Sequence, residues 1–375
     1  MIARHRLIGS LVVALTLGVW PVTPPLRAAT DLPGRLDDRD FWRLTEELSE
    51  PNGYFRSENL VSNEVVFSRV LPALSQDAKP GGVYLGVGPE QNFTYIAAMR
   101  PRMAFIIDIR RGNLLLHLMY KALFELSADR AEFVSKLFTK PRPAGLTAES
   151  TAQDLMNAYW DAVTGTEEAY RQNLASIFDV LVSRHGFVLS TQDREGLEFV
   201  YRSFYWFGPS INWSSSANGG AGGRATFADL MMQADATGRG LSFLATEEGF
   251  RYLKDLEARN LIVPVVGNFG GPKAIRAVGK YIRDAGATVS AFYLSNVEQY
   301  LRQDSIWGRF CENSATLPID ASSVFIRPSG GGVVVTRVQP GGGSAAGRVF
   351  TTVTATLGSP LGEILTETRN CGGGF

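Results

Sequence analysis

The sequence predicts an α/β fold with a doubly wound, mostly parallel sheet, a large helical insertion and a short C-terminal β extension. The first observation is that at least four strand–helix units follow one another along the chain. The second is that the strands are short continuous apolar runs, such as "AFIIDI" at 104–109, as expected when both faces of a sheet are covered. The third is a strand, glycine turn, helix and acid-terminated strand at 83–113.

Composition is that of an ordinary globular protein. The chain has 375 residues, 45% hydrophobic and 20% charged, with 37 basic and 37 acidic side chains. The formal net charge of zero and the lack of a basic stripe argue against a nucleic-acid partner. The expected partner is a small molecule, because of the glycine turn discussed below. No feature of the sequence specifies an oligomeric state.

Residues 1–29 resemble an export signal. A basic start, "MIARHR", precedes the apolar run "LIGSLVVALTLGVW" and then small residues around Ala28 and Ala29. The apolar run is short for a membrane span, so we expect cleavage near Ala28 or Ala29, an exported protein (periplasmic or extracellular), and no stable span afterwards. The alternative is an uncleaved N-terminal anchor.

The first half of the predicted sheet lies at 81–124, after an N-terminal helical segment at 30–80. In that segment we expect one helix in "RDFWRLTEELSE" and a second in "SENLVSNEVVFSRVLPALS", where Phe67, Val70, Leu71 and Leu74 share a face. Strands are expected at "VYLGV" and "AFIIDI". The helix "NLLLHLMYKALFEL" follows, with Asn113 as its expected N-cap.

Residues 125–224 predict a helical insertion that ends in a Gly/Ser loop at 208–224. The second half of the core, 225–310, resumes the alternation of strands and helices. The expected strands are "LSFLA", "LIVPVV" and "ATVSAFYLS", and the expected helices are "TEEGFRYLKDLEARN" with Thr246 as N-cap, "GPKAIRAVGKYIRDAG" and "NVEQYLRQ". Residues 311–375 form the C-terminal extension and tail, with possible strands "SSVFIR", "GVVVTRV" and "GRVFTTVTATL".

The glycine turn after the first strand predicts a ligand site. Gly86 and Gly88 permit close approach of a ligand to the backbone, and Asp108 ends the next strand twenty residues later, the usual offset for an acid that binds ribose hydroxyls. Glu90 stands where a helix N-terminus would otherwise bind pyrophosphate, and Gln91 replaces a third glycine. The carboxylate repels phosphate but suits a cationic ligand without phosphate.

With these residues, 81–113 and 239–300 resemble the Rossmann-type core of class I S-adenosylmethionine-dependent methyltransferases, and in particular an uncharacterised exported bacterial group. The resemblance implies S-adenosylmethionine as cofactor and methyl transfer to an unidentified substrate as activity. It implies that Gly86 and Gly88 hold the methionine part and Asp108 the ribose. No catalytic residue is identified.

Further polar residues follow other strands. Asn268 and Phe269 leave one buried strand at positions where methyltransferases often place a polar and an aromatic residue. The remaining pocket candidates are Tyr293, Asn296 and Glu298 at the next strand exit, and Asn63 and Glu64 upstream. The alternative for Asn268 and Asn296 is simple helix capping, and for Asn63 and Glu64 a solvated helix face. The Gly270–Gly271 turn into the next helix could instead be an anion site, with Lys273 nearby.

Two other functions remain open. An exported, non-catalytic relative could use the same pocket for another small molecule or a protein partner. A nicotinamide-dependent oxidoreductase is disfavoured by Glu90. No metal site is expected, because His117 and His185 have no partner at ligand spacing, and neither a G-x-S-x-G elbow nor a P-loop occurs.

The only two cysteines, Cys311 and Cys371, predict a disulfide in an oxidising compartment. Such a bond would tie the glycine-rich tail to the domain. The alternative is two unpaired thiols.

Overall fold

The computed structural model describes residues 31–64, 70, 71, 74, 81–215, 224–327 and 361–363. The predicted signal peptide, residues 1–29, lies outside this part of the chain, as do the possible strands at 332–338 and 347–357. No helix within the described part is long and apolar enough to cross a membrane.

One mixed sheet forms the centre, and it confirms the predicted fold class. Its order is β3-β2-β1-β4-β5-β6, in which the first five strands run parallel and the last is antiparallel. The strands are β1 (Val83–Gly86), β2 (Met103–Asp108), β3 (Ile262–Val266), β4 (Val289–Tyr293), β5 (Val324–Ile326) and β6 (Leu361–Glu363). Every residue of β1 to β5 is buried, which explains the continuous apolar runs in the sequence.

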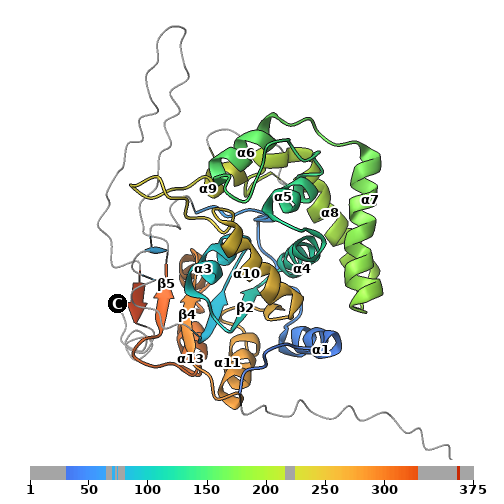
Figure 1. Cartoon of the computed structure of the whole chain (residues 1–375). Helices are drawn as coiled ribbons and strands as arrows, with labels where there is room; N and C mark the ends of the chain where they lie inside the picture. Colours follow the sequence, from blue (N-terminus) through green and yellow to red (C-terminus); the bar gives the residue numbers. More distant parts are fainter. Residues whose placement is uncertain are drawn as a thin grey trace, which may run out of the picture.

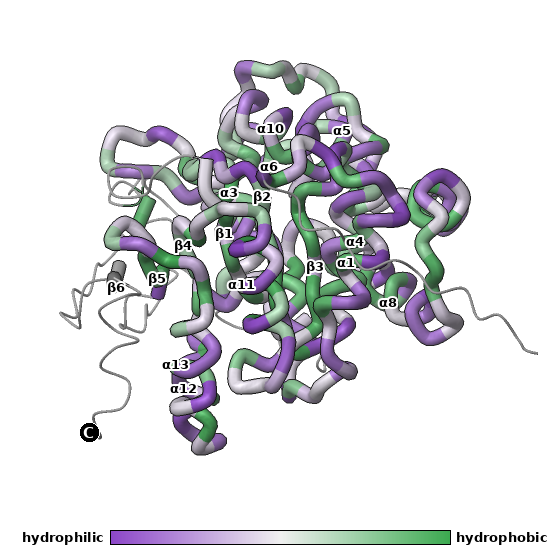
Figure 2. The backbone as a smooth tube through the Cα atoms, turned by 90° about the horizontal axis from the view of Figure 1, so that it is seen from below, coloured by the Kyte–Doolittle hydropathy of each residue, from purple (hydrophilic) through white to green (hydrophobic). Residues whose placement is uncertain are grey.

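Helices cover both faces of the sheet (Figure 1). On one face α3 (Gln91–Met99), α4 (Arg111–Leu126) and α10 (Glu247–Ala258) pack together; on the other lie α1 (Asp38–Leu48), α11 (Ala274–Asp284) and α13 (Trp307–Ala315). The short helix α12 (Val297–Gln303) follows β4. Figure 2 shows hydrophobic residues gathered on the central strands and hydrophilic residues on the outer helices.

The predicted insertion is helical. It contains α5 (Arg130–Phe138), α6 (Ala152–Asp161), α7 (Glu167–Phe178), the π-helical turn η2 (Asp179–Arg184), α8 (Thr191–Phe207) and the 3-10 turn η3 (Gly208–Ser210). The short helix α9 (Phe227–Met231) follows in the segment predicted as the second half of the core and packs on α6 and η3. Capping boxes at Thr151 and Ser190 begin α6 and α8. The insertion joins the core where α8 packs on α4.

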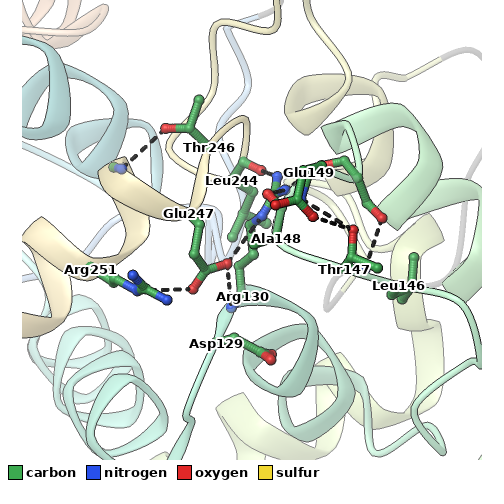
Figure 3. A network of polar contacts seen from close by, with 12 residues as sticks. Asp129, Arg130, Leu146, Thr147, Ala148, Glu149, Leu244, Thr246, Glu247 and Arg251 are labelled. Carbon is green, nitrogen blue, oxygen red and sulfur yellow. Dashed lines mark hydrogen bonds and ion pairs between the residues drawn. The ribbon is translucent and has the colours of Figure 1, made fainter.

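Arg130 ties the start of the insertion to the core (Figure 3). Its guanidinium donates to the carbonyl oxygens of Leu244 at 2.7 Å and Ala245 at 2.9 Å, and to those of Ala148 at 2.8 Å and Ser150. This contact also explains a wrong prediction: residues 241–245 form turns, not a strand, because two of their carbonyl oxygens face Arg130 and not a neighbouring strand.

The second helix predicted at 57–75 is wrong in its first half. Residues 57–64 are irregular and run along the end of the sheet, while Leu71 and Leu74 are helical and buried. The long-range contacts of residues 57–64, described below, outweigh their local helical pattern.

Candidate functional site

The site predicted from the sequence lies beyond the carboxyl ends of β1 and β4. These neighbouring strands separate the two halves of the sheet, because the chain continues from β1 to β2 on one side and reaches β4 on the other. This is the switch point at which doubly wound sheets bind ligands. Gly86 ends β1 and Tyr293 ends β4.

The glycine turn is held from inside by Asn92. The Asn92 Nδ2 donates to the carbonyl oxygens of residues 87–89, and its Oδ1 accepts a 2.8 Å hydrogen bond from the Tyr84 hydroxyl. A Cβ on Gly86 would lie 2.0 Å from Asn92 Oδ1, and Gly88 has a left-handed φ of 79°. The space that Gly86 provides is therefore occupied by Asn92.

Glu90 is a fully buried acid at the start of α3. It is 0% exposed, stands at the N-cap position and accepts hydrogen bonds from the backbone N–H of Ser62 at 3.1 and 3.3 Å. Burial raises the pKa of Glu90 to about 7, although the Ser62 hydrogen bond opposes the shift. The carboxyl group can therefore carry or release a proton near neutral pH.

A second buried acid, Glu64, lies at the end of β4. Its carboxylate accepts hydrogen bonds from the Tyr293 hydroxyl at 2.7 Å and the Ser295 hydroxyl at 2.5 Å, and Gln91 Nε2 donates to the Tyr293 oxygen at 2.9 Å. Burial raises the pKa of Glu64, against the effect of both hydroxyls. The structure thus brings Glu64 and Tyr293 together, and Asn63 lies half-buried next to Glu64.

Asp108, the acid predicted to bind ribose, is paired within the chain. Its Oδ1 accepts from the backbone N–H and Nε of Arg110 at 2.9 and 3.1 Å, and its Oδ2 from Nη2 at 3.2 Å. The Arg110 Nη1 also donates to the carbonyl oxygens of Ser57, at 3.2 Å, and Glu58. A ligand can reach the Asp108 carboxylate only if Arg110 moves.

The turn after β3 binds an anion of the chain itself. The Glu50 carboxylate accepts hydrogen bonds from the backbone N–H groups of Asn268, Lys273 and Ala274, at 3.1, 2.8 and 2.9 Å, at the start of α11. A Cβ on Gly271 would lie 2.3 Å from Glu50 Oε2, which explains the glycine there. Asn268 serves this turn through its backbone N–H and through its side chain, because Oδ1 accepts a 2.9 Å hydrogen bond from the Gly270 N–H, as the capping alternative expects.

Phe269 is a core residue. It is buried, and its ring lies 5.0 Å from that of Phe292 and 5.8 Å from that of Phe310. The side chain packs in an aromatic cluster with Phe292 and Phe310. This packing favours a structural role for Phe269 over contact with a cofactor.

The other two candidates lie on α12. Asn296 stands at the N-cap position without a capping hydrogen bond from its side chain. Glu298 accepts two hydrogen bonds from Arg327, at 2.9 and 3.0 Å. Of the residues expected at the exit of β4, Tyr293 contacts Glu64 directly, and so does Ser295.

Several buried polar atoms beside the glycine turn have no hydrogen-bond partner among the described residues. They are Asn113 Nδ2 and Oδ1, Gln91 Oε1, His117 Nδ1 and the Tyr120 hydroxyl. The rings of His117 and Tyr120 lie 5.5 and 5.2 Å from that of Phe93, and His117 Nε2 lies 2.9 Å from the Gly88 carbonyl oxygen. Buried groups of this kind normally bind water or a ligand.

Asn113 corrects the prediction of an N-cap. Helix α4 begins at Arg111, with Arg110 in the cap position, so Asn113 lies inside the first turn and is 2% exposed. One helical turn separates it from His117, on the same face of α4. The sequence contained this signal, since positions 113, 117 and 120 are polar residues at helical spacing in an apolar helix.

Electrostatics at the turn favour a ligand without phosphate. Burial lowers the pKa of His117 to about 4, so the imidazole is neutral, while the Gly88 carbonyl and Asp108 act against that shift. Two buried acids and one acid–arginine pair then leave the site without excess positive charge. No cluster of three metal-binding side chains occurs in the described ranges.

Cys311, on α13, takes part in a disulfide. Cys371 is the only other cysteine of the chain and lies outside the described residues, so the pairing with it stays a prediction.

A family model described as a domain of unknown function (DUF7790) matches residues 59–204 and 224–349. The two segments cover well over half of the 375 residues. The chain belongs to the DUF7790 family. The match includes the glycine turn, Glu64, Asp108, Asn113 and β4, so the site described above is part of the DUF7790 domain. No curated protein matches the chain.

Proposed function

We propose that the chain is a methyltransferase-like protein that binds S-adenosylmethionine, or a related cationic adenosine compound, at the glycine turn. The observation that carries the proposal is a group of buried polar atoms without a hydrogen-bond partner among the described residues. Gln91 Oε1 and His117 Nδ1 belong to residues that contact Gly88, and the Asn113 amide and the Tyr120 hydroxyl lie on the same helix as His117. They lie at the switch point, where this class of sheet binds ligands.

The residues present fit such a ligand in part. The Asn113 amide can both donate and accept, as the edge of an adenine requires, and Glu90 and Glu64 favour a positive over a negative ligand group. Asp108 can bind ribose hydroxyls once Arg110 is displaced. Bound S-adenosylmethionine would supply an activated methyl group, and the chain's own residues would orient it and exclude water.

Calorimetric titration of residues 30–375 with S-adenosylmethionine and S-adenosylhomocysteine tests the proposal. Micromolar binding would support it. Absence of binding at millimolar ligand would overturn it and favour the second function: an exported, non-catalytic relative that binds another small molecule or a protein. The Asp108–Arg110 ion pair and the filling of the Gly86 space by Asn92 support that second function.

Asp108 gives a sharper test of the same site. We expect Asp108→Asn to weaken S-adenosylhomocysteine binding by about 1–3 kcal/mol, the value of a charge-assisted hydrogen bond. Asp193→Asn is the matched control, because Asp193 is also a buried carboxylate paired with an arginine, Arg111, but away from the turn. Equal affinity of the Asp108 variant and the wild type would remove Asp108 from the site.

We further propose that residues 1–29 are a cleaved export signal. The intact mass of the protein isolated from the periplasm or medium should then correspond to a chain that starts at residue 29 or 30. A full-length mass in a membrane fraction would instead indicate the uncleaved anchor.

A further inference from the structure

One irregular segment, residues 49–64, crosses the carboxyl ends of four parallel strands in their order in the sheet; we call it the strap. At β3, the Glu50 N–H donates to the Val266 carbonyl at 2.7 Å. Just beyond β2, the Gly53 N–H donates to the Ile109 carbonyl at 2.8 Å. At the ends of β1 and β4 the strap supplies the Ser62 N–H to Glu90 and the Glu64 carboxylate to Tyr293. The strap therefore occupies the crevice where ligands bind in this class of sheet.

The strap places its own groups on sites that suit a ligand. Glu50 fills the anion-binding start of α11, and the Ser62 N–H faces the buried acid Glu90. Both contacts are of the kind that a small polar ligand would make. The strap acts as an occupant of the crevice and not as an additional layer of core.

The middle of the strap is attached by separate polar and ring contacts and not by a packed core. Asn52 Oδ1 accepts from the Arg111 N–H, the Ser57 hydroxyl donates to the Trp213 carbonyl, and Phe55 and Arg56 contact Tyr300. Leu60, Val61 and Ser62 are buried, whereas the middle is open and Tyr54 is 85% exposed. The strap has no helix or strand of its own, and no residue between 51 and 59 is buried. A segment held this way can open without unfolding of the domain.

Arg110 couples the strap to Asp108. One edge of the guanidinium, Nε and Nη2, donates to the Asp108 carboxylate, and Nη1 donates to the carbonyl oxygens of Ser57 and Glu58. An arginine stays protonated, so both sets of acceptors share one permanent charge. When the strap leaves, Arg110 loses its carbonyl acceptors and is free to turn toward water, which exposes Asp108.

We propose that the strap is an autoinhibitory lid: while closed it fills the crevice and keeps Asp108 paired with Arg110, and its release opens the site. The inference rests on the proposed function for the ligand that enters. The opening of the strap itself can be measured without any ligand.

Hydrogen exchange of the full chain tests the opening. We expect the Gly53 and Ser62 amides to exchange at least about tenfold faster than those of Val83 and Ala104 in the sheet. Arg110→Gln should accelerate Gly53 and Ser62 further and leave the sheet amides unchanged. If the strap and sheet amides exchange at one rate in both proteins, the strap opens only by global unfolding and the proposal is wrong.

A disulfide that holds the strap closed tests whether the strap controls ligand access. A Cβ on Gly53 would lie 2.4 Å from Ile109 Cγ1, so the double variant Gly53→Cys, Ile109→Cys places two thiols within disulfide reach. Affinity for S-adenosylhomocysteine is measured oxidised and reduced, with the wild type in both buffers as control for the Cys311 disulfide.

The two proposals fail in different ways. We expect the oxidised variant to bind at least about tenfold more weakly than its reduced form, a difference of about 1.4 kcal/mol. Equal binding in both states would mean that the strap does not control access to the site, and the proposed ligand site would be unaffected. If neither the wild type nor the reduced variant binds, the proposed ligand is wrong, and the exchange rates alone decide whether the strap is a lid.

Discussion

Two polar side chains, Arg130 and Asn113, are equally buried but differ in the number of hydrogen bonds that they form. Each is 2% exposed. Arg130 donates to four backbone carbonyl oxygens through Nη1 and Nη2. Its Nε has no hydrogen bond among the described residues but forms an ion pair with Glu247 at 3.3 Å. Neither polar atom of the Asn113 side chain has a partner among the described residues. The difference indicates that Arg130, with most of its donors bonded, holds the fold, whereas the Asn113 amide is available to a ligand.

The largest expected effect comes from substitution of Arg130. Arg130→Met should lower the free energy of unfolding by about 3–5 kcal/mol, because it leaves the buried Glu247 with only the exposed Arg251, 3.8 Å away, and removes the donor for four carbonyl oxygens. Denaturant titration of the purified chain measures the change.

Arg142→Met is the control for Arg130. Arg142 pairs with Asp129 in an exposed position, so its loss should cost no more than about 1 kcal/mol. Similar losses for the two variants would mean that the Arg130 network contributes little, and the contrast with Asn113 would then collapse.

A pair of asparagines sharpens the comparison. Asn113→Leu should raise the free energy of unfolding by about 1–2 kcal/mol, because it removes an unsatisfied amide, and should weaken the proposed ligand at least about tenfold. Asn92→Leu should lower the free energy of unfolding by about 1–3 kcal/mol, because Asn92 satisfies three carbonyl oxygens and the Tyr84 hydroxyl. Thermal and denaturant unfolding of both variants decide; an Asn113 variant as unstable as the Asn92 variant would make Asn113 a structural residue.

The sequence predicts those features that local patterns determine. The apolar runs at β2 and β3 and the Thr246 cap are confirmed, since burial of a strand and capping of a helix depend on adjacent residues. Residues 241–245 fail because Arg130, more than 110 residues away in the chain, takes their carbonyl oxygens.

The site is less predictable than the sheet for the same reason. Gly86 and Gly88 fall at the switch point and Asp108 ends the neighbouring strand β2, as expected. Glu50, however, reaches Lys273 from 223 residues away, and no local pattern identifies Glu50 as the partner. The N-cap prediction for Asn113 is wrong for a different reason. Asparagine is common at helix N-caps, but α4 begins three residues earlier than expected, with Arg110 in the cap position.

His117 in α4 and His185, directly after η2, extend the comparison to pH. His185 Nδ1 lies 2.7 Å from Asp38 and Nε2 lies 2.9 Å from Glu125, so both nitrogens have partners, as an imidazolium requires. Burial acts to lower the pKa of His185, but Glu125 and then Asp38 raise it overall, against the nearby charge of Lys121. His117, with Nδ1 unpartnered, has its pKa lowered by burial to about 4.

The sign of each contribution follows from linkage. The folded pKa of His185 is raised, so its stabilisation is fully present below the unfolded value of about 6.5 and is lost as pH rises through the folded pKa. The folded pKa of His117 is lowered, so stability is lost as pH falls from about 6.5 toward 4. We expect His185→Gln to lower the free energy of unfolding by about 1 kcal/mol at pH 6 and by less at pH 9.

His117→Gln separates the two effects. It should flatten the loss of stability between pH 6.5 and 5 and change nothing above pH 7.5, where the wild-type His117 is neutral in both states. Thermal unfolding of both variants and the wild type from pH 5 to 9 measures how the stability of each protein changes with pH. If the His185 variant kept a constant difference from the wild type across that range, its ring would be held by packing, and two carboxylate partners would not be enough to make a buried histidine a charged one.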